Sequence, residues 1–127
     1  MSTNIVNGVD FRAVEIVNRF RIESYGKTFE WDGEATVKVI DDAYEVLLSC
    51  AKNGVSKKLV SSDGGEGEGE YYSRVWEIHF ESTDETFYVE IEGLYNSWEG
   101  VEFHKGCSGV YLVEPVPVEV IQYHVVK

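Results

Sequence analysis

The sequence predicts an α+β domain in which an antiparallel, twisted sheet or partly open β-barrel packs against one helix at about residues 42–52. Two observations lead to this expectation. Apolar and polar residues alternate with a period of two over residues 76–81 and again over 87–92, which is typical of half-buried strands. One stretch in the first half combines helical apolar spacing with capping residues. With 127 residues, 43% of them apolar, and no long linker, the chain is expected to form a single domain over residues 1–127.

The part of the chain before the expected helix contains one ambiguous element. The apolar residues of 11–22 fit a strand as well as a helix opened by Asp10, and the sequence leaves both interpretations open. Residues 36–40 resemble a short strand that follows a turn at 31–33.

The helix over 42–52 is expected from its two ends and from its apolar face. Asp42 and Glu45 have the spacing of a capping box, and Asn53-Gly54 provides a stop signal. The residues that would share one buried face are Ala43, Val46, Leu47 and Cys50. We therefore expect Cys50 to pack in the core rather than to act as a nucleophile.

Residues 76–81 and 87–92 indicate two strands of an antiparallel hairpin, joined by the polar stretch 82–85. Their apolar residues fall on one side, whereas their glutamates fall on the other side together with His79 and Tyr88. We expect a hairpin with one apolar face and one acidic face that also carries aromatic residues.

The last part of the chain is also strand-like. Residues 110–113 form a short apolar run, and valines alternate over 116–120. Proline cannot donate to a strand ladder, so Pro115 and Pro117 place the start of this strand at an edge or a bulge. The β-branched and aromatic residues of 121–126 are expected to complete the sheet.

The chain is strongly acidic, and its charge is concentrated. It has 23 acidic and 11 basic side chains, for a net charge of −12, and twelve of the acids lie between Ser61 and His104 with Arg74 as the one base. Such crowding costs self-repulsion and suggests a partner or an ion. Nucleic acids and anionic membranes attract Lys and Arg, so direct binding to either is disfavoured. A basic protein is the expected partner.

Composition also bears on location. No run approaches the roughly 20 apolar residues of a membrane span, and the first residues lack the basic start and apolar core of a signal peptide. The two cysteines, Cys50 and Cys107, are therefore expected to be reduced. We expect a cytoplasmic protein that does not enter the membrane.

Residues 63–70 alternate glycine with acidic residues and leave three interpretations open. They could form a flexible acidic loop. In an extended strand, a bare glycine row would lie opposite an anionic row that imitates a nucleic-acid strand in a basic groove. A hard cation such as calcium could also bind the carboxylates. The residues of the anionic row would be Glu66, Glu68 and Glu70, continuing into Tyr72 and Arg74.

The segment 93–100 places aromatic and polar side chains between two glycines. It is either a hairpin turn whose aromatic residues pack on the sheet or a contact loop. As a contact loop it would present Tyr95, Trp98 and Glu99 to a partner.

The sequence predicts no catalytic residue, no metal and no cofactor. His104 and Cys107 have the spacing of two zinc ligands, but no second such pair accompanies them. No nucleophile motif stands out, and in a chain with 23 acids a neighbouring pair of carboxylates carries little information. We therefore expect a binding protein rather than an enzyme.

Three motifs in order resemble a fingerprint of small uncharacterised bacteriophage proteins. They are the GGEGEGE run at 64–70 with the aromatic strand after it, the YNSWEG turn at 95–100, and the VEP segment at 113–115. The resemblance covers about residues 63–123, and residues 1–60 have no counterpart. It implies a phage protein acting inside a bacterial cell on host machinery or host defence, and it implies no particular activity.

The favoured function is non-enzymatic binding. The carboxylate-rich face of residues 61–104 would bind and inhibit a basic, nucleic-acid-binding host or host-defence protein. The residues expected to contact this partner are Glu66, Glu68, Glu70, Tyr72, Arg74, Tyr95, Trp98 and Glu99.

The main alternative is a protein that sequesters a small nucleotide signal in a pocket formed by a homo-oligomer. Aromatic side chains would stack on the base and cations would bind the phosphates. The aromatic candidates are Tyr71, Tyr72, Tyr95 and Trp98, and the cationic candidates are Arg74, Lys57, Lys58 and Lys105. A minor structural component of a virion is a third hypothesis.

Overall fold

The computed structural model describes residues 4–29, 31–64, 70–96, 100–104, 106–117 and 123–126. These residues form two helices and a seven-stranded open sheet, which confirms the predicted α+β class and excludes closure of this sheet into a barrel. The elements are β1 (Ile5–Val6), β2 (Val9–Asp10), α1 (Phe11–Tyr25), α2 (Val37–Leu48), β3 (Val55–Gly64), β4 (Glu70–Phe80), β5 (Glu85–Asn96), β6 (Gly100–Glu102) and β7 (Gly109–Val113).

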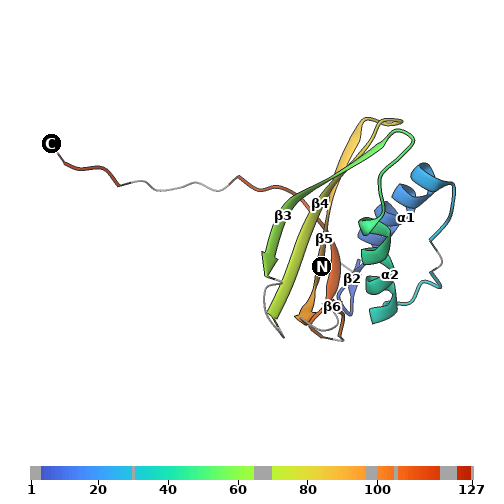
Figure 1. Cartoon of the computed structure of the whole chain (residues 1–127), viewed down its shortest axis with the longest axis horizontal. Helices are drawn as coiled ribbons and strands as arrows, with labels where there is room; N and C mark the ends of the chain where they lie inside the picture. Colours follow the sequence, from blue (N-terminus) through green and yellow to red (C-terminus); the bar gives the residue numbers. More distant parts are fainter. Residues whose placement is uncertain are drawn as a thin grey trace.

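The sheet separates a covered face from an open one. Its strands lie in the order β1-β2-β7-β5-β4-β3, and β6 pairs with the end of β5. All pairs are antiparallel except β2 with β7. Both helices cover the same face of the sheet (Figure 1). The described residues thus place two helices on the sheet, where the sequence predicted one.

Helix α1 forms because residues 11–25 carry apolar side chains at helical spacing and both ends are capped. Asp10 is the N-cap and accepts a hydrogen bond from the backbone amide of Arg12 at 3.1 Å. Gly26 follows the last turn in the left-handed conformation, with φ 68°. The residues that α1 buries are Ala13, Val14, Val17, Phe20 and Ser24. Of the two interpretations that the sequence left open, the helix opened by Asp10 is the one formed.

Helix α2 begins earlier than the predicted helix. Thr36 is its N-cap, so the strand expected at 36–40 is wrong, and these residues form the first turn of α2. The apolar side chains of this turn continue the helical spacing of the residues after it, and burial on one face outweighs their β propensity. The residues that α2 buries are Val39, Ile40, Ala43, Val46 and Leu47.

Two side chains assigned to the predicted helix have other environments. Asp42 lies inside α2 and pairs with Lys38 at 2.7 Å, so it does not cap the helix. The helix ends before Ser49, and Cys50 follows it with an exposed side chain. The expectation that Cys50 packs in the core is therefore wrong.

Strands β4 and β5 form the predicted antiparallel hairpin. Trp76 pairs with Val89 and Ile78 pairs with Phe87, so these apolar residues face the helices. The largest fully buried side chains come from both the helices and the sheet and include Phe20, Ile40 and Leu47 of the helices and Phe80, Ile78 and Ile91 of the strands. The period of two in the sequence therefore identified the buried face of the hairpin correctly.

Arg19 of α1 fastens the β4–β5 turn to the helical layer. Its guanidinium carbon lies 3.9 Å from the centroid of the Phe80 ring. Its nitrogens pair with Glu23 at 2.6 Å and Glu85 at 3.2 Å, and one donates to the hydroxyl of Thr83 at 2.6 Å. The turn is therefore held by a cation–π contact and by charged hydrogen bonds.

The first hairpin is shaped by glycine. Asn7 and Gly8 have φ values of 50° and 78°, which suits the tight turn between β1 and β2. The carbonyl of Gly8 accepts a hydrogen bond from the amide of Val110 at 2.9 Å. A Cβ at position 8 would lie 2.2 Å from the carbonyl oxygen of Ser108, so only glycine allows this approach.

A buried carboxylate joins this hairpin and α1 to the middle of the sheet. Asp10 is fully buried, and its Oδ1 and Oδ2 accept hydrogen bonds from the Arg12 guanidinium at 3.0 and 2.9 Å. Oδ2 also accepts a bond from the backbone amide of Leu112 in β7 at 3.0 Å. Burial alone would raise the pKa of Asp10, but the hydrogen bonds from Arg12 and Leu112 outweigh it and hold the pKa below its ordinary value.

Strand β7 confirms the strand predicted at 110–113. The strand expected to follow it is wrong for the residues that the structure describes. Residues 114–117 and 123–126 have no strand assignment and no strand partner, and residues 118–122 lie outside the described part.

Replacement of Asp10 by Ala is expected to lower the free energy of unfolding by about 2–4 kcal/mol, because it removes a helix cap and an acceptor for a buried amide. The folded-state pKa is depressed, so the stabilisation is present above the unfolded pKa of about 4 and is lost as the pH falls through the folded value. Urea unfolding at pH 7 and in acid measures both effects.

The matched control is Asp42→Ala, which removes a pair whose Lys38 side chain is 80% exposed. We expect it to change the free energy of unfolding by at most about 0.5 kcal/mol. Equal losses for the two variants at pH 7 would contradict the structural role of Asp10.

Candidate functional site

The sheet face opposite the helices carries a set of carboxylates and tyrosines, which we call the acidic–tyrosine face. Strand alternation puts alternate residues of β4 and β5 on this side, and cross-strand register aligns them with residues of β3 and β7. The residues that define the face are Asp63, Tyr71, Glu77, Tyr88, Glu90, Glu92 and Tyr111.

Register brings a hydroxyl next to each of the three central glutamates. Glu77 pairs with Tyr88, and Glu90 pairs with Tyr111. Glu92 is opposite Ser73. The face therefore consists of carboxylates with hydroxyl-bearing neighbours rather than of bare acidic side chains.

Hydrogen bonds orient these carboxylates. The hydroxyl of Tyr71 donates to Glu92 Oε1 at 2.8 Å, and that of Tyr88 donates to Glu77 Oε2 at 3.2 Å. Ser73 Oγ donates to Glu90 Oε2 at 3.0 Å. Each glutamate keeps further lone pairs, because an ionised carboxylate can accept about four hydrogen bonds. The face is thus partly ordered and still able to accept donors from a partner.

Burial and neighbouring negative charge raise the pKa of two tyrosines on this face. Burial and the hydrogen bond to Glu92 raise the pKa of Tyr71 to about 12. Burial, together with the charges of Glu92 and Glu90, also raises the pKa of Tyr111. At neutral pH both phenols therefore stay protonated and act as donors toward carboxylates.

Tyr111 reaches the glutamates because a glycine leaves space beneath its ring. A Cβ on Gly109 would lie 2.3 Å from the Tyr111 hydroxyl oxygen and 2.4 Å from the ring carbons. Gly109 is the register partner of Glu92. The tyrosine ring thus lies over Gly109, beside the carboxylate that raises its pKa.

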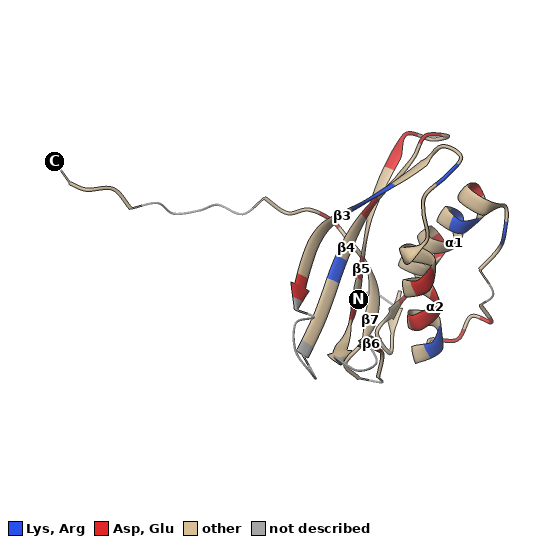
Figure 2. Cartoon of the chain, viewed as in Figure 1, with Lys and Arg blue, Asp and Glu red and all other residues tan. Residues whose placement is uncertain are grey.

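Positive charge is scarce on this face. Lys58 is the register partner of Glu77, and Lys58 is exposed. Within the described residues, no Lys, Arg or His lies within ion-pair distance of Glu77, Glu90 or Glu92. Acidic residues recur along the strands and at the β4–β5 turn in Figure 2.

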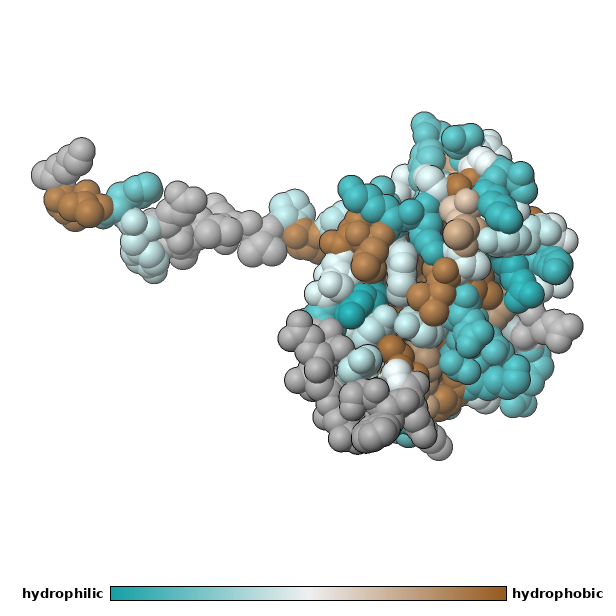
Figure 3. Space-filling view, in the orientation of Figure 1, coloured by the Kyte–Doolittle hydropathy of each residue, from teal (hydrophilic) through white to brown (hydrophobic). Residues whose placement is uncertain are grey.

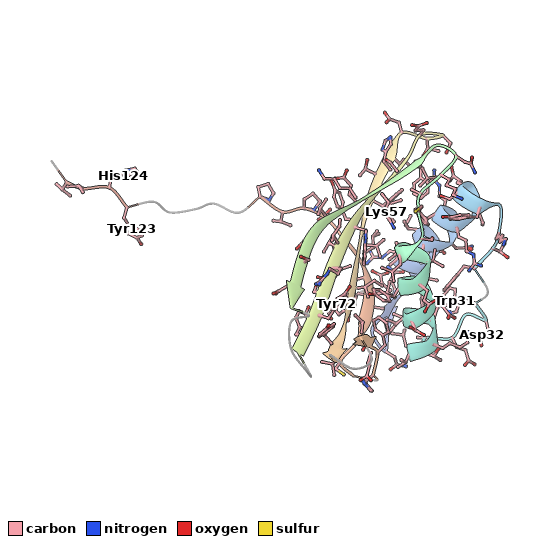
Figure 4. All side chains as sticks on the ribbon, in the orientation of Figure 1. Trp31, Asp32, Lys57, Tyr72, Tyr123 and His124 are labelled. Atoms are coloured by element: carbon pink, nitrogen blue, oxygen red, sulfur yellow. The ribbon has the colours of Figure 1, made fainter. Side chains whose placement is uncertain are left out.

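Tyr72 and Arg74, two of the predicted contact residues, lie on the opposite face, under the helices. Tyr72 is 7% exposed, and its hydroxyl shares a hydrogen bond with that of Tyr44 in α2 at 3.2 Å. It points from β4 toward the helices (Figure 4). The Arg74 guanidinium lies 4.1 Å from the Tyr72 ring centroid and donates to the carbonyls of Asp63 and Ser73. Neither side chain belongs to the acidic–tyrosine face.

The remaining predicted contact residues are only partly placed. Tyr95 pairs with Glu70 across β4 and β5 and with Val101 of β6, and it is half-buried. The predicted contact residues that lie outside the described part are Glu66, Glu68, Trp98 and Glu99.

The cations proposed for a nucleotide pocket do not meet at one place. Lys57 lies under α2, where its ammonium donates to the carbonyls of Leu47 and Ser49, the latter at 2.6 Å. Burial lowers the pKa of Lys57. Lys58 belongs to the open face, whereas Arg74 belongs to the covered face. Lys105, the fourth candidate, lies outside the described part.

The described residues contain no group of three His, Cys, Asp or Glu side chains that could hold a metal ion. The pair with zinc-ligand spacing makes other contacts. His104 Nε2 lies 3.1 Å from a carboxylate oxygen of Glu102, and the Cys107 thiol donates to the backbone carbonyl of His104. Neither described helix is long and apolar enough to cross a bilayer.

An open groove of about 1000 Å³ lies between the end of α1 and α2. Its charged lining is mixed, because Arg21, Lys27 and Lys38 line it together with Asp42 and Glu45. Lys38 is already paired with Asp42. This groove therefore has no single charge preference, in contrast to the acidic–tyrosine face.

Comparison of the chain with protein-family models, with curated proteins and with solved structures found no match.

The sequence predicted only part of the tyrosine set of this face. It placed Tyr88 on the acidic side of the hairpin, because Tyr88 lies two and four residues before Glu90 and Glu92 and therefore on the same side of the strand. It gave Tyr71 only as a candidate for a nucleotide pocket. Tyr111 had no such signal, because the pairing of β7 with β5 is not encoded in any local spacing. The same alternation puts Tyr72 on the side of Trp76, which indicates burial rather than contact with a partner.

Replacement of Glu92 by Gln is expected to lower the pKa of Tyr71, because it removes a negative acceptor while burial of the phenol remains. The pKa of Tyr111 should fall as well. Titration of tyrosine ring carbons by ¹³C NMR measures both. Tyr72 on the covered face serves as the internal control, and a shift in its pKa equal to that of Tyr71 would contradict the placement of the two tyrosines on opposite faces.

Proposed function

We propose that this protein binds and inhibits a basic, nucleic-acid-binding protein through its acidic–tyrosine face. The observation that carries the proposal is the array of Glu77, Glu90 and Glu92 on an open sheet face, with hydroxyl donors beside each carboxylate and no described cation within ion-pair distance. Such a face offers negative charge that the described cations of the protein do not pair with.

The sheet gives these charges a regular arrangement. Glu90 and Glu92 are two residues apart on one strand, which separates their positions by roughly 6.8 Å, and neighbouring strands are about 4.8 Å apart. A basic groove that accommodates a phosphate backbone presents Lys and Arg side chains to repeated negative charges of this kind. The carboxylates would replace the phosphates, and inhibition would follow from competition for one groove.

The tyrosines add contact area to the charge. Tyr71 is 47% exposed, and its phenol is rigid, with one apolar ring and one polar end. Tyrosine is enriched in protein interfaces for this reason. Arginine side chains of the partner could stack on such rings while their guanidinium groups reach the adjacent carboxylates.

We extend the proposal to a bacterial host. The resemblance of the sequence to bacteriophage proteins supports a host or host-defence protein as the target, and the bacterial cytoplasm as the place of action. The rival proposal, sequestration of a nucleotide signal, is less well supported, because Lys57, Lys58 and Arg74 do not converge.

The test uses the triple variant Glu77→Gln, Glu90→Gln, Glu92→Gln. Proteins captured from bacterial lysate by the wild-type chain would be purified, and their affinity measured at about 50 and about 500 mM salt. We expect the affinity to fall at least tenfold in high salt and about tenfold in the triple variant, since each charge contributes up to about 1 kcal/mol. The wild-type chain should also displace the captured protein from duplex DNA.

The control is the triple variant Glu15→Gln, Glu34→Gln, Glu45→Gln, which makes the same change in net charge at exposed residues of α1, α2 and the loop between them. We expect its affinity to remain within about twofold of wild type. Equal losses in both triple variants, or an affinity that does not depend on salt, would contradict the proposal.

A further inference from the structure

The described residues of the C-terminal segment, 114–117 and 123–126, expose several apolar side chains to solvent. Four of its described apolar side chains are largely accessible: Val116 is 71%, Tyr123 91%, Val125 87% and Val126 94% exposed. Figure 3 shows brown, hydrophobic surface on the extended segment beyond the body of the molecule, and Figure 4 places Tyr123 and His124 well away from the sheet. Apolar side chains in this number favour burial against a partner.

The sequence of this segment is that of a strand, although its described parts pair with none. Valines alternate over 116–120, and β-branched and aromatic residues continue to Val126. Only the prolines Pro115 and Pro117 resist pairing, and they lie at its start. A strand-forming sequence without a strand partner indicates that the partner edge is elsewhere.

Among the described strands, the longest one at an edge of the sheet is β3. This strand has ten residues and pairs with β4 on one side only, at the end of the strand order. Leu59 and Val60 lie at its bulge and are 49% and 42% exposed. A long edge with exposed aliphatic side chains readily accepts a further strand.

We propose that the segment 114–126 of one copy adds as a strand along the β3 edge of a second copy, and that the exchange is reciprocal. Both halves of the contact belong to the same chain, so a two-fold dimer satisfies both segments and both edges at once. Charge supports the match, because Lys58 lies on β3 and the segment carries Glu114 and Glu119. This inference does not depend on the proposed function.

The geometry favours a second copy over the same chain. Val113, the last residue of β7, pairs with Tyr88, which pairs with Glu77, which pairs with Lys58 of β3. The segment would have to turn back immediately and cross the open face to reach its own β3. Residues 114–117 are exposed instead, and two prolines in this stretch favour an extended, stiff connection. The chain leaves β7 away from the sheet (Figure 1).

The test measures the molar mass of the full chain by light scattering over a concentration series up to on the order of 100 µM. We expect a concentration-dependent dimer for the wild-type chain. The variant Val125→Lys, Val126→Lys and the edge variant Val60→Lys should each weaken dimerisation at least tenfold, because each loses burial of an aliphatic side chain and introduces a charge.

Two single variants control for the added charge. Leu48→Lys changes an apolar side chain of α2 that is 56% exposed, and Val6→Lys changes one on the opposite sheet edge that is 43% exposed. We expect both to dimerise like the wild type. Circular dichroism would check that all variants keep the fold.

Mixing the two weakened variants separates exchange from other modes of association. The edge variant has an intact segment, and the segment variant has an intact edge, so a mixed dimer restores one of the two contacts. We expect more dimer in the mixture than in either variant alone. A monomeric wild-type chain at the highest concentration, no rescue on mixing, or equal weakening by the Val6→Lys control would each overturn the proposal.

Discussion

The buried Asp10 carboxylate is the interaction on which the rest of the structure depends. Its two oxygens cap α1, bind the guanidinium of Arg12 and accept the amide of Leu112 in β7. One side chain thus fixes the helical layer to a central strand by hydrogen bonds that cannot be exchanged for water when the group is fully buried. The alignment of α1 above the sheet follows, and with it the division between a covered and an open face.

That division explains how a chain with a net charge of −12 folds although no described cation lies within ion-pair distance of Glu77, Glu90 or Glu92. The two helices bury the apolar side chains of β4 and β5. Because side chains alternate between the two faces of a strand, the glutamates of these strands lie on the open face. Repulsion between Glu77, Glu90 and Glu92 is moderated by solvent and by the hydroxyl donors that the structure describes beside them. A basic partner would relieve this repulsion, which is the physical origin of the proposed affinity.

The periodicity of the sequence predicted those features that depend only on residues close to one another in the chain. The hairpin of residues 76–92, the strand at 110–113 and the acidic character of one hairpin face all follow from a period of two. The predicted start of the helix was wrong because the β-branched residues at 36–40 resemble a strand until the burial of Val39 and Ile40 on one face of α2 is known. The junction at Asp10 and the place of Tyr111 depend on pairing with β7, which no spacing in the sequence encodes.

The proposed strand exchange and the proposed binding face use different parts of one sheet. Exchange occupies the backbone edge of β3, whereas a basic partner would contact the acidic–tyrosine face, whose residues other than Asp63 lie on β4, β5 and β7. Adding a strand to β3 would therefore leave that surface open in both copies. Like charges would drive the two acidic–tyrosine faces apart, so that each could meet its own basic site. A dimer would then bind a target with two basic sites more tightly than a single face, by raising the effective concentration of the second contact.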